Sequence, residues 1–256
     1  MSIPSFHHSS LKPQDSVVSL DAKEASHAAK SRRLRVGQRV RLFNGFGLVA
    51  LGALSLVERR TVMVELDSFE QLDPPARRVS IAVAIPKGDR QKVMVDILTQ
   101  LGVFEIIPVR CRYSETKFND NTAEKWLRVS IEACKQSQNP WMPRIASEQD
   151  LDQLLGSLPE SSDNSDPSSI SSLQSNHSQT TQHSQRNLVV ANTDGECLLS
   201  LAQSNSDVTV LIGPEGGFSE QEFSKLRQFS VPSMRIGPYI LRTEAAAISA
   251  ASMLVG

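Results

Sequence analysis

The first seventy residues carry short apolar runs that are separated by glycines and polar positions, a spacing typical of short β-strands. The runs cover 37–43, 48–56 and 61–66, and Asn44-Gly45 lies between the first two as a hairpin signal. Several short strands at this spacing predict a small β-barrel over residues 1–72. Asp73-Pro74-Pro75 then begins a stiff, non-helical connector over residues 73–78.

Beyond this connector the pattern changes to strands that alternate with helices. Residues 79–85 are a continuous apolar run, 89–101 keep a helical period that ends at Gly102, and 103–109 are apolar again. Asp89 can cap this first helix, and residues 122–138 predict a second one. A strand, a helix and a strand in succession favour parallel pairing, so we expect an α/β domain over residues 79–256.

A serine-rich stretch over residues 160–186 interrupts this domain. It holds ten serines in 27 residues, and its only sizeable apolar side chains are those of Ile170 and Leu173. Such a segment cannot bury enough surface to offset the entropy of ordering it, so we expect a disordered insert. A regulated or partner-binding segment is the alternative. Apolar strands are expected again at 187–191 and 207–212.

The strand at 207–212 runs directly into a glycine-rich loop, Leu211-Ile-Gly-Pro-Glu-Gly-Gly-Phe218. Ser219 and Glu222 have the spacing of a capping box, and Phe218 and Phe223 that of a hydrophobic staple, so a helix is expected to begin here. Three glycines in five residues let a ligand approach bare backbone, whose amides can hydrogen-bond a nucleobase or ribose. A plain tight turn is the alternative.

A second loop of the same kind follows about twenty residues later. A strand at 233–236 ends in Gly237-Pro238, three apolar residues follow at 239–241, and Arg242-Thr243-Glu244 opens an alanine-rich helix over 244–254. Loops at the carboxyl ends of neighbouring parallel strands form a ligand crevice, so the two loops together favour a cofactor pocket. Arg242 as a surface charge and Glu244 as a carboxylate near a helix N-terminus are the alternatives.

The net charge of the chain is close to zero, but the charged residues are unevenly distributed along the sequence. There are 27 Lys and Arg against 28 Asp and Glu, a net charge of −1, yet residues 25–57 contain no acidic residue. A basic cluster falls within twelve positions of that stretch; its members are Lys30, Arg32, Arg33, Arg35, Arg39 and Arg41. Clustered cations on a β-barrel indicate contact with RNA phosphates, and a solvated basic loop is the alternative.

Cysteine usage and hydropathy exclude several classes of protein. Cys111, Cys134 and Cys197 are odd in number and scattered, which suits neither a disulfide scaffold nor a zinc site, so we expect no metal and a reducing, cytoplasmic location. The longest apolar stretch, residues 46–57, is shorter than the about 20 residues of a membrane helix. The N-terminal residues do not resemble a secretory signal or a transit peptide.

The two C-terminal loops resemble a known family. Leu211 to Ser219 and Ile236-Gly-Pro-Tyr-Ile-Leu-Arg-Thr-Glu244 are similar to the I-G-P-E-G-G and L-G-x-x-I-L-R-T-E blocks of the ribosomal RNA small subunit methyltransferase E family. This family belongs to the SPOUT methyltransferases, which have a trefoil-knotted cofactor site. Looser similarities lie upstream, at Pro86–Arg90, at 101–103 and at 134–137 ahead of Pro143.

The resemblance implies a PUA-like RNA-binding barrel followed by a SPOUT α/β domain with a deep trefoil knot. It implies S-adenosylmethionine as cofactor and methylation of N3 of a uridine in small-subunit (16S) ribosomal RNA by a homodimer. The implied cofactor-binding residues are Leu211, Ile212, Gly213, Glu215, Gly216, Gly217, Ile236, Gly237, Tyr239, Ile240, Leu241 and Thr243. The implied RNA-binding residues are His27, Lys30, Arg32, Arg33, Arg35, Lys87 and Arg90.

The same resemblance makes Arg242 and Glu244 the candidate catalytic residues. Arg242 would stabilise the negative charge that spreads onto the uracil oxygens when N3 loses its proton, because a fixed cation is most effective where charge develops. Glu244 would position the base or accept that proton.

The chain departs from the family pattern at three places. Lys30-Ser31-Arg32-Arg33 replaces the usual Val-Leu-Arg after the histidine, Gln100 replaces a glutamate before Leu101-Gly102, and Lys135 to Asn139 lacks the usual arginine. Two rival functions stay open: a SPOUT ribose 2′-O-methyltransferase acting on tRNA or rRNA, and a non-catalytic RNA-binding protein. A dinucleotide oxidoreductase is disfavoured, because residues 79–89 lack its glycine fingerprint.

Overall fold

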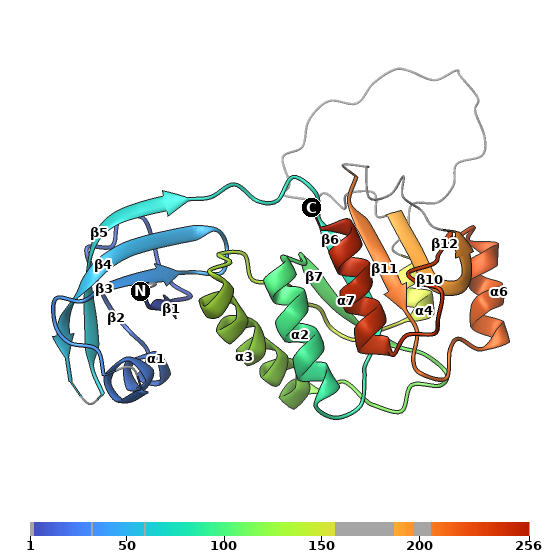
Figure 1. The fold of residues 1–256 in the computed structure, drawn as a ribbon, viewed down its shortest axis with the longest axis horizontal. Coiled ribbons are helices and arrows are strands. Elements are labelled where there is room, and N and C mark those ends of the chain that lie inside the picture. Colours follow the sequence, from blue (N-terminus) through green and yellow to red (C-terminus); the bar gives the residue numbers. More distant parts are fainter. Residues whose placement is uncertain (1–2, 32, 59, 157–186, 197–205, 256) are drawn as a thin grey trace, which may run out of the picture.

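The computed structural model describes residues 3–31, 33–58, 60–156, 187–196 and 206–255, which form two sheets joined by an extended connector (Figure 1). The N-terminal sheet has five strands in the order β1-β3-β4-β5-β2. Their bounds are Ser5–His7 (β1), Val17–Ser19 (β2), Arg39–Phe43 (β3), Leu48–Val57 (β4) and Val62–Gln71 (β5). The predicted hairpin is confirmed, because β3 and β4 pair antiparallel across the Asn44-Gly45 turn.

The N-terminal sheet has a hydrophobic core of its own. Alternate residues of β3 and β4, among them Val40, Leu42 and Leu54, meet Phe6 of β1 in one buried cluster. Two short helices cover this core, α1 (Ala22–Ser26) and the π-helix η1 (His27–Ser31). The side chain of Asp21 caps α1 by accepting a hydrogen bond from the amide of Glu24.

The second sheet has seven strands, and every pair in it is parallel. The order is β12-β10-β11-β6-β7-β8, with β9 also on β7. The strands are β6 (Val79–Ala84), β7 (Glu105–Arg110), β8 (Arg144–Ile145), β9 (Gln149–Asp150), β10 (Asn187–Glu196), β11 (Val208–Ile212) and β12 (Ser233–Met234). The predicted α/β domain with a parallel sheet is therefore confirmed.

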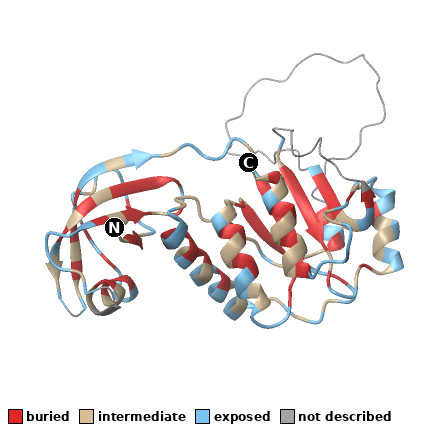
Figure 2. Cartoon of the chain, viewed as in Figure 1, coloured by how far each residue is buried: buried red, intermediate tan, exposed pale blue. Residues whose placement is uncertain are grey.

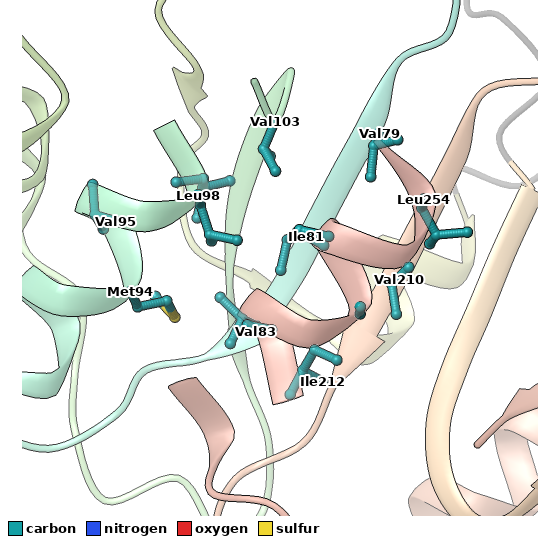
Figure 3. Packing of buried hydrophobic residues seen from close by; sticks show 14 of the residues in the cluster. Val79, Ile81, Val83, Met94, Val95, Leu98, Val103, Val210, Ile212 and Leu254 are labelled. Atoms are coloured by element: carbon teal, nitrogen blue, oxygen red, sulfur yellow. The ribbon is translucent and has the colours of Figure 1, made fainter. Parts of the chain in front are cut away.

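Helices cover both faces of this sheet (Figures 1 and 2). The helices α2 (Arg90–Leu101) and α7 (Thr243–Leu254) pack on one face, with α3 (Asp120–Ser137) beside α2, whereas α4 (Leu151–Gly156) and α6 (Glu220–Gln228) pack on the other. β6 is buried on both sides, because Ile81 and Val83 point to the α2 and α7 face while Ala82 and Ala84 point to the α4 and α6 face. Figure 3 shows Met94 and Leu98 of α2 in the first of these cores.

The alanines of α7 explain how closely it packs. Ala247, Ala250 and Ala251 are fully buried in the same cluster as Ile81 and Met94, so their small side chains let the helix backbone approach β6 and α2. The helix therefore packs closely on β6 and α2 at these three positions.

Of the two predicted caps of α2, the structure confirms only the C-terminal one. Gly102 ends the helix in the left-handed conformation with φ of 86°, as predicted. Asp89 occupies the N-cap position, but its side chain makes no capping hydrogen bond there, so the predicted capping role is wrong. Its ψ of −12° keeps the residue helical rather than extended, which is not the backbone conformation that a capping side chain needs.

The N-terminal sheet is held against the second sheet by α3 and the segment after it. Lys135 of α3 donates hydrogen bonds to both carboxylate oxygens of Glu24 at 3.0 Å, and both side chains are buried. The amide of Gly47 donates to the carbonyl of Pro140, and the ring of Trp141 packs on Gly47. These contacts cross the junction between the two sheets and fix their relative placement.

Asn139, one of the departures from the family pattern, has a structural role at this junction. Its side-chain amide donates to the carbonyl of Thr99 at 2.9 Å, and its side-chain oxygen accepts from the amide of Trp141 at 2.9 Å. Asn139 therefore connects the end of α2 to the Trp141 segment.

The predicted insert at 160–186 lies outside the described residues, as do Arg32 and Cys197. Within the described ranges, no helix is long and apolar enough to cross a membrane.

Candidate functional site

Two loops meet at the carboxyl edge of the second sheet. Loop 1 (Gly213–Ser219) follows β11, and loop 2 (Arg235–Arg242) follows β12. Thr243, the residue directly after loop 2, contacts loop 1, because its hydroxyl donates to the carbonyl of Gly213 at 3.2 Å. The expectation that β11 and β12 are neighbours is wrong, because β10 lies between them and pairs with both. The end of β10 therefore forms a third wall of the site.

Loop 1 is fixed by its own sequence. Both hydrogen bonds of the predicted capping box between Ser219 and Glu222 are present, and the rings of Phe218 and Phe223 pack edge to face with centroids 5.5 Å apart. Gly213 is required here, since a Cβ at this position would stand 2.9 Å from the Phe218 ring. Gly217 adopts φ of 73°, which favours glycine. The predicted strand, loop and helix start are confirmed.

Loop 2 is different, because it presents apolar side chains to solvent. Tyr239 is 81% exposed and Ile240 87% exposed, while Thr243 behind them is buried. Arg242 is the N-cap residue of α7, with extended backbone and an exposed side chain. Among the described residues, no carboxylate lies within ion-pair range of Arg242.

A cavity of about 350 Å³ lies between the two loops and the end of β10, within the size range of small-molecule sites. Eleven residues that the sequence analysis named line it: Ile212, Gly213, Glu215, Gly216, Gly217, Ile236, Gly237, Tyr239, Ile240, Leu241 and Thr243. Leu211 does not, because the alternation of β11 turns its side chain into the core on the α4 and α6 face. The sequence and the cavity thus agree at every named position but one.

Sequence reasoning missed part of the lining. The missed residues are Ala191, Asn192, Thr193, Pro214, Phe218, Phe223 and Ala246. Asn192 and Thr193 belong to β10, and they supply polar side chains at the edge where β11 and β12 also end. The rule that ligands bind at the carboxyl ends of parallel strands could have found them, had the place of β10 between the other two been known.

Charged groups gather beside this cavity. Glu244, in the first turn of α7, has a side chain that is 13% exposed, and its Oε2 atom is buried with no hydrogen-bond partner among the described residues. Arg90, at the start of α2, lies 3.8 Å from Glu244 and 3.5 Å from Glu215 of loop 1. The structure thus brings together Arg90, Glu215 and Glu244, which we call the cavity ion cluster.

Cys111, which directly follows β7, is a buried free cysteine. Burial raises the pKa of the Cys111 thiol to about 12, so at neutral pH it is protonated and a poor nucleophile. In the part of the chain that the structure describes, no three His, Cys, Asp or Glu side chains gather in a metal-binding group.

The predicted RNA-contact residues differ in exposure and in the partners that they contact. Arg33 and Arg35 are exposed in the segment between η1 and β3, while His27 is half-buried with its ring edge-on to Phe6. Lys87 pairs with Glu115. The side chain of Lys30 lies outside the described residues, like the whole of Arg32.

Two further members of the basic cluster bind to the protein itself. Arg39 pairs with Asp67, and Arg41 donates to the hydroxyl of Ser5 and the carbonyl of Gln138. Within the described cluster, Arg33 and Arg35 are therefore the cations best placed to meet a partner.

Comparisons with known proteins agree with this architecture. An RNA methyltransferase domain matches residues 73–255, and an RNA methyltransferase PUA domain matches residues 20–67. The chain is 29% identical to Ribosomal RNA small subunit methyltransferase E of Rickettsia conorii, over 93% of this chain and 88% of that protein. Its identity to the Bacillus subtilis protein of the same name is 26%, over 92% and 88%.

Solved structures give the same picture of the fold. A Ribosomal RNA small subunit methyltransferase E from Neisseria gonorrhoeae, bound to S-adenosyl methionine, superposes with a TM-score of 0.81 at 20% identity, over 98% of this chain and 96% of that one. A probable rRNA-methyltransferase from Porphyromonas gingivalis gives 0.76 at 25% identity, over the same shares. The chain belongs to the RNA methyltransferase family, with a PUA domain before the catalytic domain, and the resemblance to the small subunit methyltransferase E proteins is confirmed.

Proposed function

We propose that this protein uses S-adenosylmethionine to methylate N3 of a uridine in small-subunit ribosomal RNA, as a cytoplasmic homodimer. The observation that carries the proposal is the cavity between loop 1 and loop 2, whose lining coincides with the residues that resemble the family's cofactor motifs. The relatives named above, which match this chain over more than nine-tenths of its length, support the choice of substrate.

The cavity fits the cofactor by shape and by chemistry. Gly213, Gly216 and Gly217 expose backbone to its interior, and Gly213 has no room for a side chain. Backbone groups of these glycines and of Ile236, Gly237 and Leu241 would bind adenosine and methionine. Asn192 and Thr193 add polar side chains beside them. When bound, S-adenosylmethionine supplies an already activated methyl group, so the protein mainly aligns the reactants and excludes water.

The residues beside the cavity suit the removal of the uracil N3 proton. Arg242 is exposed and lies at the N-cap of α7, directly after Leu241 of the lining, so it can approach the oxygens of an entering base. There its charge would stabilise the anion that forms as N3 loses its proton. Glu244 has a buried carboxylate oxygen without a partner, which can position the base or accept the proton.

Arg33 and Arg35 support contact of the N-terminal sheet with RNA, because both are exposed and residues 25–57 contain no acidic residue that would repel phosphate. Their substitution by glutamine should weaken RNA binding for all sequences and lower its salt dependence. An affinity that does not respond to salt would contradict this contact.

The homodimer is supported by loop 2. Tyr239 and Ile240 are large apolar side chains that stand in solvent beside the cavity, and association would cover them. Sedimentation of the wild type and of Ile240→Asp tests this step, with a dimer expected for the first and a monomer for the second.

The decisive experiment is mass spectrometry of ribosomal RNA nucleosides from cells with and without the gene. We expect 3-methyluridine to be lost from the small-subunit RNA and to return on complementation. Loss of a ribose-methylated nucleoside instead would show the 2′-O-methyltransferase. An unchanged nucleoside profile together with RNA binding would favour the non-catalytic protein. Purified Arg242→Ala should transfer methyl groups at least about 100-fold more slowly, since loss of one charge-stabilising donor has that order of effect.

A further inference from the structure

Arg90 connects the two carboxylates of the cavity ion cluster. Its guanidinium lies 3.5 Å from Glu215 of loop 1 and 3.8 Å from Glu244 of α7, so one side chain connects loop 1 with the start of α7. Both distances are too long for good hydrogen bonds, and the Arg90 side chain is 40% exposed. Partly exposed ion pairs at such distances contribute little to stability, so stabilisation does not account for the arrangement.

Glu244 is the less exposed carboxylate of this cluster. Its side chain is 13% exposed, and among the described residues its Oε2 atom has no hydrogen-bond partner. Among the described residues, Arg90 is the cation found within ion-pair range of it. Arg90 approaches the Oε1 atom of Glu244 and not the Oε2 atom.

The first turn of α2 holds Arg90 in this place. The neighbouring Gln91 accepts a hydrogen bond at 3.1 Å from the indole of Trp126, which is buried between α2 and α3. Met94, one turn further along, is fully buried in the core under α7. The backbone that carries Arg90 is therefore anchored, and only its side chain is free to adjust.

We propose that Arg90 is a positioning residue that acts through Glu244 rather than a contact for RNA phosphate. It holds Oε1 so that Oε2 remains directed to the reacting base, and its link to Glu215 ties that orientation to loop 1. This inference rests on the proposed function, because it assigns Glu244 its place in methyl transfer.

The test is a double-mutant cycle with Arg90→Gln, Glu244→Gln and the pair together, with Arg90→Lys as the conservative variant. Lys92→Gln is the matched control, because it removes one exposed positive charge from the same helix. For each protein, kcat is measured at saturating RNA and cofactor. RNA affinity is measured against salt, and the melting temperature shows that the variant is folded.

We expect Arg90→Gln to lower kcat by about 10- to 100-fold, the scale of a misplaced catalytic group, with RNA affinity and its salt dependence unchanged. The double variant should be no slower than Glu244→Gln, because Arg90 has nothing left to position. Arg90→Lys, which retains the charge, should recover part of kcat. Lys92→Gln should match the wild type.

Three results would overturn the inference. One is a weaker, less salt-dependent RNA affinity of Arg90→Gln with normal kcat, which would show a phosphate contact. Another is an additive effect on kcat in the double variant. The third is an unchanged kcat of Glu244→Gln. A wild-type protein without any methyl transfer would instead overturn the proposed function, and this role of Arg90 with it.

Discussion

The protein contains two ionic clusters that differ in burial and in geometry. At the junction of the two sheets, Lys135 binds both oxygens of Glu24 at 3.0 Å, and the two side chains are 5% and 3% exposed. At the cavity, Arg90 lies 3.5 and 3.8 Å from two carboxylates and is 40% exposed. In the first cluster both oxygens of Glu24 accept hydrogen bonds, whereas the second is loose, and one oxygen of its Glu244 has no hydrogen-bond partner among the described residues.

This difference separates a structural ion pair from a functional one. A desolvated pair with short hydrogen bonds allows only one arrangement, so it fixes the N-terminal sheet on α3. A half-exposed cluster with longer distances contributes little to stability, but it can rearrange when a substrate enters. The comparison predicts that substitutions at the junction change stability and that substitutions at the cavity change activity.

The largest effect is expected for Lys135→Ala. The substitution leaves the buried carboxylate of Glu24 without its counter-ion, which should lower the free energy of unfolding by about 3–5 kcal/mol. Urea denaturation measures this loss. Lys23→Ala is the matched control, because Lys23 is 60% exposed and lies 3.8 Å from Glu132, another carboxylate of the same junction, so its loss should cost less than about 1 kcal/mol.

The double variant Lys135→Met with Glu24→Leu sharpens this result. Because both charges are removed together, most of the lost stability should return. Failure to recover would mean that packing around the pair, rather than the unpaired charge, carries the effect.

The next largest effect is expected for Gly47→Ala at the same junction. A Cβ at Gly47 would stand 2.3 Å from the ring of Trp141, so this ring at the junction must move. We expect a loss of about 1–3 kcal/mol, the usual cost of overpacking. Gly37→Ala is the control, because Gly37 has a similar φ of 87° but no atom within 4 Å. Equal losses in the two variants would show backbone strain instead of a clash at the junction.

The sequence predicts the two loops of the site better than the β10 wall, because the signals differ in range. The Ser219 and Glu222 capping box and the Phe218 and Phe223 staple lie within five residues of one another, so loop 1 could be predicted together with its helix. The place of β12 beside β10 depends on pairing between distant strands, which no local pattern encodes. Asn192 and Thr193 were missed for that reason.

The ion pair at the junction could not be predicted from the sequence for the same reason. Lys135 and Glu24 are 111 positions apart, and each alone reads as an ordinary surface charge. Asp89 shows the opposite error, because a residue typical of helix N-caps stands at that position without forming the hydrogen bond. Local composition predicts elements and their ends, while the contacts between elements decide which charges become buried or directed at the cavity.

A smaller effect is expected when pH is varied. Burial raises the pKa of Glu24 above its usual value, and the nearby charge of Lys135 offsets only part of that rise. The folded state then binds this proton more tightly than the unfolded state. The resulting contribution to stability is complete below the unfolded pKa of about 4.3 and is lost as the pH rises through the folded pKa.

The difference in unfolding free energy between the wild type and Glu24→Gln isolates this group, because the two proteins share their other titrating side chains. It should decrease as the pH is raised from about 4 toward neutrality. A difference that increases over this range would show that attraction to Lys135 outweighs burial at this site.

The smallest effect on stability is expected for Arg90→Gln, the variant expected to lose most of its turnover. The cavity cluster is half-exposed at Arg90 and has no short hydrogen bonds, so its loss should change the free energy of unfolding by less than about 1 kcal/mol. Lys92→Gln on the same helix should behave alike in urea denaturation. If Arg90→Gln lowered the free energy of unfolding as much as Lys135→Ala, both clusters would stabilise the fold, and the distinction between a structural and a functional cluster would be wrong. If the free energy of unfolding of Arg90→Gln hardly changed while its kcat fell 10-fold or more, the cavity ion cluster would serve the reaction and not the stability of the fold.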